Sequence, residues 1–139
     1  MKKWSQSYGF LLGKVLQQME NEFAEGLVSF QINARQYGVL LFIKENPYSS
    51  QKDVSESLKI DRTTMVSHID HLEALGFVKR TKNPNDRRSY SLLITEKGDE
   101  ILHSRWEFLH KTELGVLAPL DSEEQKVLKT LLIKVWKSL

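Results

Sequence analysis

Cysteine is absent from all 139 residues of the sequence. A disulfide framework, a thiolate zinc site and a thiol-based redox switch are therefore excluded. The sequence also has no run near the ~20 apolar residues that a membrane span requires. Gly13, Lys14, Gln17 and Gln18 interrupt the apolar residues near the N-terminus, which argues against a signal peptide. We therefore expect a cytoplasmic protein that makes no contact with a membrane.

Motifs of enzyme chemistry are also missing. The sequence has no glycine-rich phosphate loop, no nucleophile elbow and no His-Glu-x-x-His pair, so we predict no enzymatic activity and no cofactor. The nearest metal-like pattern is the row of His103, Glu107 and His110 on one predicted helix. Such a row is able to bind zinc, but it is also typical of a solvated helix face. We favour the solvated face and keep zinc as an alternative.

Net charge is only +2, which does not by itself indicate a polyanionic partner. The distribution of charge is more informative than the sum. A single acid, Asp86, stands within a short basic segment that contains Lys79, Arg80, Lys82, Arg87 and Arg88. On charge alone, this segment is either a solvated loop or part of a surface for nucleic acid.

Hydrophobic periodicity predicts helices in the first third of the chain. Apolar residues recur at helical spacing from Trp4 to Leu27, which predicts a helix over residues 4–30. A second helix is expected over 33–44 with Tyr37 and Leu40 near the core, and it ends before Pro47.

Two short helices follow in the centre of the chain. Ser50 and Asp53 have the spacing of a capping box that opens the first. Asp61 caps the second, over 62–75, whose buried stripe is Met65, Ile69, Leu72 and Leu75. Gly76 then stands where a C-terminal glycine belongs. This is a helix-turn-helix pattern.

A hairpin comes directly after this helix pair. Residues 77–78 and 90–94 have strand character, and the turn residues 83–86 lie between them. A hairpin in this place is a wing, so the predicted fold class is mainly α (α+β), a winged helix-turn-helix.

Long helices are expected at both ends of the chain. Thr95 caps a helix that runs to about Val116, and Asp121 with Glu124 opens the last helix. Their wide apolar stripes need a partner, for which a second copy is the simplest solution. We therefore predict one domain over 1–139, in which residues 1–32 and 99–139 form dimerisation helices and 33–98 a DNA-binding lobe.

The DNA contacts are expected from the helix over 62–75 and from the wing. A helical wheel places Thr63, Ser67 and His71 opposite the buried stripe, with Thr64 and His68 at the edge. Short polar side chains suit a helix deep in a major groove, while the wing tip would reach a minor groove. We also expect Asp86 to aim one arginine guanidinium. The full set of candidate DNA-binding residues is Ser50, Gln51, Arg62, Thr63, Thr64, Ser67, His68, His71, Arg80, Lys82, Asn83, Asp86, Arg87 and Arg88.

Five segments in order resemble the MarR family of regulators. They are Gln36-Tyr37-Gly38-Val39-Leu40, Asp61-Arg62-Thr63-Thr64, the run from Leu72 to Arg80, Asp86-Arg87-Arg88 and Thr95-Glu96-Lys97-Gly98. The resemblance covers roughly residues 10–135. It implies a homodimer that represses transcription from a near-palindromic operator on double-stranded DNA. It also implies that Arg88 enters the minor groove, supported by Asp86, and that a small-molecule effector, for which aromatic compounds are candidates, releases the DNA.

Ser67 and His68 depart from the family pattern, since many members have arginine at the first position and an apolar residue at the second. These departures affect the expected operator sequence. Alternatives are a winged-helix module for protein contacts, which would not need the wing-tip arginines, and a zinc-responsive regulator of the same fold. Residues that either line an effector pocket or belong to the core are Tyr8, Phe30, Tyr37 and Trp106.

Overall fold

The computed structural model describes residues 2–139. Six α-helices and a small three-stranded sheet account for the fold. The helices are α1 (Tyr8–Leu27), α2 (Ala34–Glu45), α3 (Gln51–Leu58), α4 (Arg62–Ala74), α5 (Glu96–Val116) and α6 (Ser122–Lys137). Short 3-10 helices, η1 (Lys3–Gln6) and η2 (Val28–Phe30), flank α1. The strands are β1 (Ser49–Ser50), β2 (Val78–Asn83) and β3 (Asp86–Ile94), and they form an antiparallel sheet in the order β1-β3-β2.

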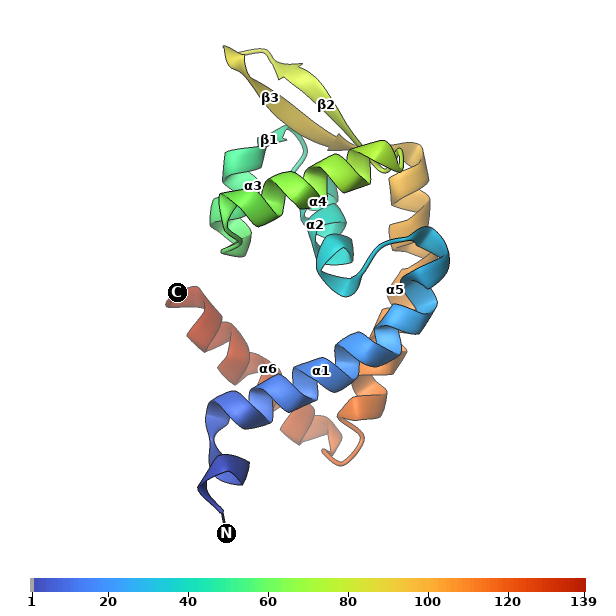
Figure 1. Ribbon diagram of the computed structural model, residues 1–139. Helices are drawn as coiled ribbons and strands as arrows, with labels where there is room; N and C mark the ends of the chain where they lie inside the picture. The colour runs from blue at the N-terminus through green and yellow to red at the C-terminus, as the bar shows by residue number, and fades with distance from the viewer. Residues whose placement is uncertain (1) are drawn as a thin grey trace.

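The predicted winged helix-turn-helix is present. In Figure 1 the β2–β3 hairpin projects from the lobe formed by α2, α3 and α4, at the opposite end of the molecule from α1 and α6. Helix α5 joins the two ends, because it starts beneath the wing and reaches α1, against which it packs. Within residues 2–139, no helix is both long and apolar enough to cross a lipid bilayer.

Helix starts agree closely with the capping signals of the sequence. Ser50 and Asp53 form the predicted capping box of α3, and Asp121 forms one with Glu124 at α6. Asp61 and Thr95 accept backbone hydrogen bonds at the starts of α4 and α5, as expected. These interactions are local in sequence, which is why spacing alone predicts them.

Two of the predicted boundaries are wrong. The helix expected over 4–30 is divided, because Ser7 has an extended backbone and caps α1. At the other end, η2 is followed by Gln31, which has a left-handed φ of 62°. The wing strands are longer than predicted and extend to Asn83 and back from Asp86. Backbone pairing along the hairpin continues beyond the apolar residues that signalled the strands.

The hydrophobic core lies in the lobe and along its junction with α5. Met65, Ile69 and Leu72 of α4 are fully buried as predicted. Leu75, the fourth residue of the predicted stripe, is only half-buried. Buried apolar side chains from the other elements include Phe23, Leu27, Tyr37, Val39, Leu40, Ile43, Val54, Phe77, Val78, Leu92, Ile101 and Leu102.

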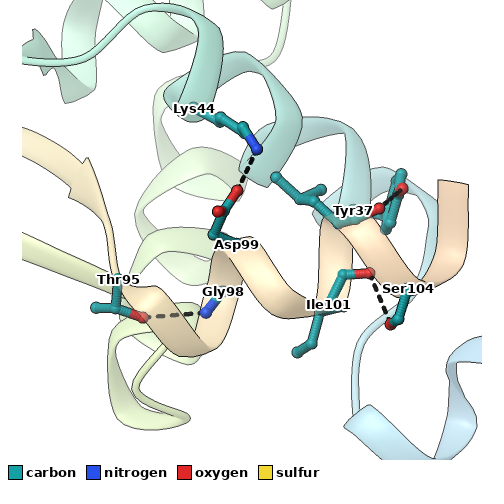
Figure 2. Close-up of polar contacts among 8 residues, drawn as sticks. Tyr37, Lys44, Thr95, Gly98, Asp99, Ile101 and Ser104 are labelled. Carbon is teal, nitrogen blue, oxygen red and sulfur yellow. Dashed lines mark hydrogen bonds and ion pairs between the residues drawn. The ribbon is translucent and has the colours of Figure 1, made fainter.

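Polar contacts fix α5 against the lobe (Figure 2). The Tyr37 hydroxyl of α2 donates to the Leu102 carbonyl of α5 over 3.0 Å, and Lys44 pairs with Asp99. Near the start of α5, Gly98 is close enough to the residue before β2 that an added Cβ would lie 2.4 Å from the Phe77 carbonyl oxygen. The lobe and the long helix are therefore tightly packed where they meet.

Candidate nucleic-acid interface

The first two turns of α4 form an exposed, mostly polar surface. Asp61 accepts a hydrogen bond from the Thr64 backbone N–H over 3.0 Å, and hydrogen bonds from the side chain and the backbone of Thr64 lower the pKa of Asp61. Since Met65 and Ile69 face the core, the side chains on the other side of these two turns are exposed to solvent. The exposed residues in these turns are Arg62, Thr63, Thr64, Val66 and Ser67.

The helical wheel misplaced His71. It is half-buried, and its Nε2 lies 2.7 Å from the Gln31 carbonyl oxygen, just beyond η2. The wheel assumed that every residue opposite the stripe faces solvent. The chain between η2 and α2 passes beside α4, and the His71 side chain contacts this segment instead.

His68 is also turned inward, toward α2. It is half-buried, and its Nδ1 lies 3.4 Å from Nε2 of Gln36. Because Oε1 of Gln36 accepts from the Asn33 backbone N–H at the α2 capping box, its amide nitrogen must donate to His68. Nδ1 is then the acceptor and the ring proton sits on Nε2, a buried atom with no hydrogen-bond partner. Burial lowers the pKa of His68, and the charges of Arg35 and His71 lower it further.

Arg80 is held by α4 and α3, although the sequence suggested a phosphate contact. Its guanidinium donates to Asp70 over 2.7 Å and to Glu73 over 2.6 Å, both on α4. A longer bond of 3.3 Å reaches Gln51 of α3. Burial alone would lower the pKa of Arg80, but the two carboxylates outweigh burial and the pKa is raised. Arg80 and Gln51 thus join the wing to the helix pair.

Sequence reasoning missed the two carboxylates that hold Arg80. Asp70 and Glu73 stand one turn apart on α4, and an arginine follows on the next strand. That spacing is a sequence signal for ion pairs within the lobe.

The tip of the wing is held by backbone pairing and by hydrogen bonds of the Asn83 side chain within the hairpin. The register slips between Lys82 and Asn83, and Asn83 pairs with Asp86 across the turn. The Asn83 side chain accepts from the Asn85 N–H over 2.9 Å and donates to Ser89. Asn83 is half-buried and closes the turn.

Asp86 has a different partner from the one expected. Its carboxylate accepts from the backbone N–H of Arg88 over 2.9 Å, where a guanidinium had been predicted. The side chains of Lys82, Arg87 and Arg88 are exposed, so the tip of the hairpin carries three cations against the one carboxylate of Asp86. The geometry therefore leaves the tip positively charged.

Ser50 lies at the junction of β1 and α3. Its side chain accepts from the Asp53 N–H, and its own N–H donates to Asp53. Both polar groups are used in the capping box, and the residue is half-buried.

The aromatic residues considered for an effector pocket do not come together. Tyr37 belongs to the core, while Tyr8 is 86% exposed on α1. Trp106 lines a hollow of about 520 Å³ between α2 and α5. Phe30 lines a separate hollow of about 430 Å³ near the base of the wing.

The row of histidines and glutamate on α5 forms no metal cluster. His103, Glu107 and His110 are all exposed. Among residues 2–139, no three histidine, aspartate or glutamate side chains are grouped so that they would hold a metal ion.

Comparisons with known proteins agree with this geometry. The model of the MarR family matches residues 30–89, which span the lobe and the wing tip. The uncharacterized HTH-type transcriptional regulator YybA of Bacillus subtilis strain 168 is 35% identical over 105 residues, 75% of this chain and 69% of YybA. The regulator BilQ of Clostridioides difficile strain CD3 is 32% identical over 101 residues, 68% of this chain and 65% of BilQ. These alignments span about two thirds of the relatives' lengths.

Similar solved structures include complexes with DNA. The transcriptional repressor CouR bound to a 23-mer duplex superposes with a TM-score of 0.86 at 27% identity, covering 97% of this chain and 96% of CouR. A mutant MarR from E. coli complexed with operator DNA has a TM-score of 0.85 at 25% identity, covering 97% of this chain and 99% of that one. Sequence, fold and the exposed basic wing thus agree, and the chain belongs to the MarR family of transcriptional regulators.

Proposed function

We propose that this regulator binds a near-palindromic operator as a homodimer in the cytoplasm and represses transcription until a small molecule releases it. One observation carries the proposal: the exposed start of α4 and the cationic wing tip are held in a fixed position relative to each other. Arg80 of β2 is bonded to both Asp70 and Glu73 of α4, so the helix and the wing have a fixed separation. A fixed separation suits two neighbouring grooves of one duplex.

The start of α4 is suited to a major groove. Thr63, Thr64 and Ser67 are short hydrogen-bonding side chains on an exposed surface, so the helix backbone can approach the base edges closely. Recognition helices of helix-turn-helix proteins commonly contact bases with their N-terminal residues. Arg62, at the first position, is exposed and would contact a phosphate or a base edge.

The wing tip is suited to the adjacent minor groove. Arg87 and Arg88 are exposed, and Asp86 binds the backbone of Arg88, which orders the turn that carries the arginine. A narrow minor groove has an enhanced negative potential that attracts arginine. Lys82 would add a phosphate contact that does not depend on sequence.

Uncovered apolar surfaces on the terminal helices support the homodimer. Helix α6 has no buried residue at all, although Leu131, Leu132, Val135 and Trp136 are among its side chains. Helix α1 likewise exposes a row of large apolar side chains over its first half, namely Tyr8, Leu11, Leu12, Val15 and Leu16. Surfaces of this kind are covered in stable proteins, and a second copy covers both at once.

Release by an effector is supported by the hollow between α2 and α5. It lies where the lobe meets the long helix, and exposed Trp106 offers an aromatic wall. A molecule bound there would alter the angle of the lobe relative to α5. In a dimer this changes the separation of the two α4 helices, which must match the helical repeat of DNA.

The direct test is a selection of random duplex DNA by the purified protein at two salt concentrations. The expected result is a palindromic motif of roughly 16–20 base pairs whose retention falls steeply with salt. Arg88→Ala should reduce affinity for that motif more than Lys82→Ala, which serves as the matched loss of a wing cation. Equal and small losses would contradict the minor-groove role, and no salt-sensitive retention would overturn DNA binding altogether.

A further inference from the structure

Val66 is the unusual residue on the exposed start of α4. Its side chain is 41% exposed, although its neighbours on this surface are polar or charged. Over residues 34–95, all of which the structure describes, the large exposed hydrophobic residues are Tyr48, Val66 and Tyr90. Val66 alone among them has no polar atom, and it lies on the helix that we assign to the major groove.

The other side chains on this part of α4 have restricted roles. His68 and His71 point to Gln36 and Gln31, and Asp70 is bonded to Arg80. The side chains left to face bases are Arg62 at the edge and the short set of Thr63, Thr64, Val66 and Ser67. None of the four short ones carries the two-pronged donor that reads guanine.

Position along the helix also favours a base contact for Val66. It is the fifth residue of α4 and lies on the same stripe as Asp70 and Glu73, at spacings of four and seven residues. Those two carboxylates are bonded to the wing strand through Arg80. Val66 is therefore on the wing side of the helix, one turn nearer its N-terminus than the ion pairs.

We infer that Val66 is a specificity-determining residue that reads a thymine in each half-site by packing against its 5-methyl group. The inference rests on the proposed function, because it requires α4 to enter the major groove. Thymine is the one base that presents a methyl group there, and apolar side chains recognise it by contact. The other three bases present hydrogen-bonding atoms and no methyl group there, and a branched apolar side chain would leave those atoms without a partner, so it also disfavours them.

The test uses the duplex recovered by the selection, with each thymine replaced in turn by deoxyuridine. This change removes only the methyl group. The wild-type protein is expected to lose affinity by about four-fold for each methyl contact removed, at one position in each half-site, the factor that corresponds to one buried CH₂ group. Val66→Ala should bind the thymine duplex and the deoxyuridine duplex equally well.

The matched control is Val66→Ile, which keeps both branches at Cβ and should keep the discrimination. Wild-type protein that is insensitive to every replacement would overturn the inference, as would Val66→Ala with undiminished discrimination. Both results leave the proposed function intact, because the duplex is still bound. Failure of the wild-type protein to retain any duplex would overturn the proposed function, and this inference with it.

Discussion

Replacing Arg80 by alanine distinguishes two roles for this side chain, a contact with DNA phosphate and a link between the wing and α4. As a phosphate contact, it would act only when DNA is bound. As the link between wing and helix, it would act in the free protein as well. Its side chain is 24% exposed, and its two hydrogen bonds to Asp70 and Glu73 are short, at 2.7 and 2.6 Å. The structure favours the second role.

The expected loss of stability is moderate because the carboxylates are solvated. Those of Asp70 and Glu73 are 61% and 41% exposed, so water replaces part of each lost interaction. We allow about 1 kcal/mol for each charge-assisted bond after solvent screening, or about 2 kcal/mol together. This corresponds to a fall in Tm of about 6 °C for a protein of this size.

Thermal unfolding and a salt titration of DNA binding measure the two effects. Arg80→Ala is expected to lower Tm and to weaken DNA binding, because the wing is then no longer held at a fixed separation from α4. The slope of log affinity against log salt should stay the same, since no phosphate contact is lost. Lys79→Ala, the exposed neighbour on β2, is the control and should leave Tm nearly unchanged. An unchanged Tm for Arg80→Ala, with a salt slope smaller by about one, would refute the reasoning.

Two further predictions concern the lobe. Gly98→Ala should destabilise the fold by about 1–3 kcal/mol, since the added Cβ would lie 2.4 Å from the Phe77 carbonyl oxygen. Gly38→Ala, on a helix with open space around it, should instead be neutral or stabilising; urea midpoints that coincide for both variants would contradict this. Because burial lowers the pKa of His68, the unfolded chain takes up a proton at this residue first as the pH falls below about 6.5. The contribution of neutral His68 to the free energy of unfolding is therefore present above that pH and is lost on acidification. In His68→Gln the urea midpoint should vary less between pH 7.5 and 5.5, and an identical pH dependence would show that burial does not disfavour the charged form of this histidine.

Local signals predicted much of the fold. The caps at Ser50, Asp61 and Thr95 follow from short-range spacing, and all three were found. The buried stripe of α4 was found except for Leu75, which is half-buried. Gly76 has the expected left-handed φ, 81°, at the end of α4. The two-residue strand β1 was not predicted, because so short a strand is defined by its partner β3 and has no pattern of its own.

Side-chain roles in the candidate interface were harder to predict. A helical wheel gives direction around one helix but not the neighbours on either side. His68 and His71 were placed toward DNA, yet α2 and the segment after η2 occupy that side of α4. For Arg80, charge alone suggested a phosphate partner, whereas the acids on α4 lie nearer. Such assignments depend on tertiary packing, which spacing within one segment does not encode.

The central claim is that two copies of α4 enter successive major grooves of one duplex. Hydroxyl-radical footprinting of the selected duplex, with the mass of the same complex measured by sedimentation, tests it most directly. The account predicts two chains per duplex and two equivalent protected regions about one helical turn (~10 base pairs) apart, with extra minor-groove protection on the flanks that disappears in Arg88→Ala. One chain per duplex with a single protected region would contradict it.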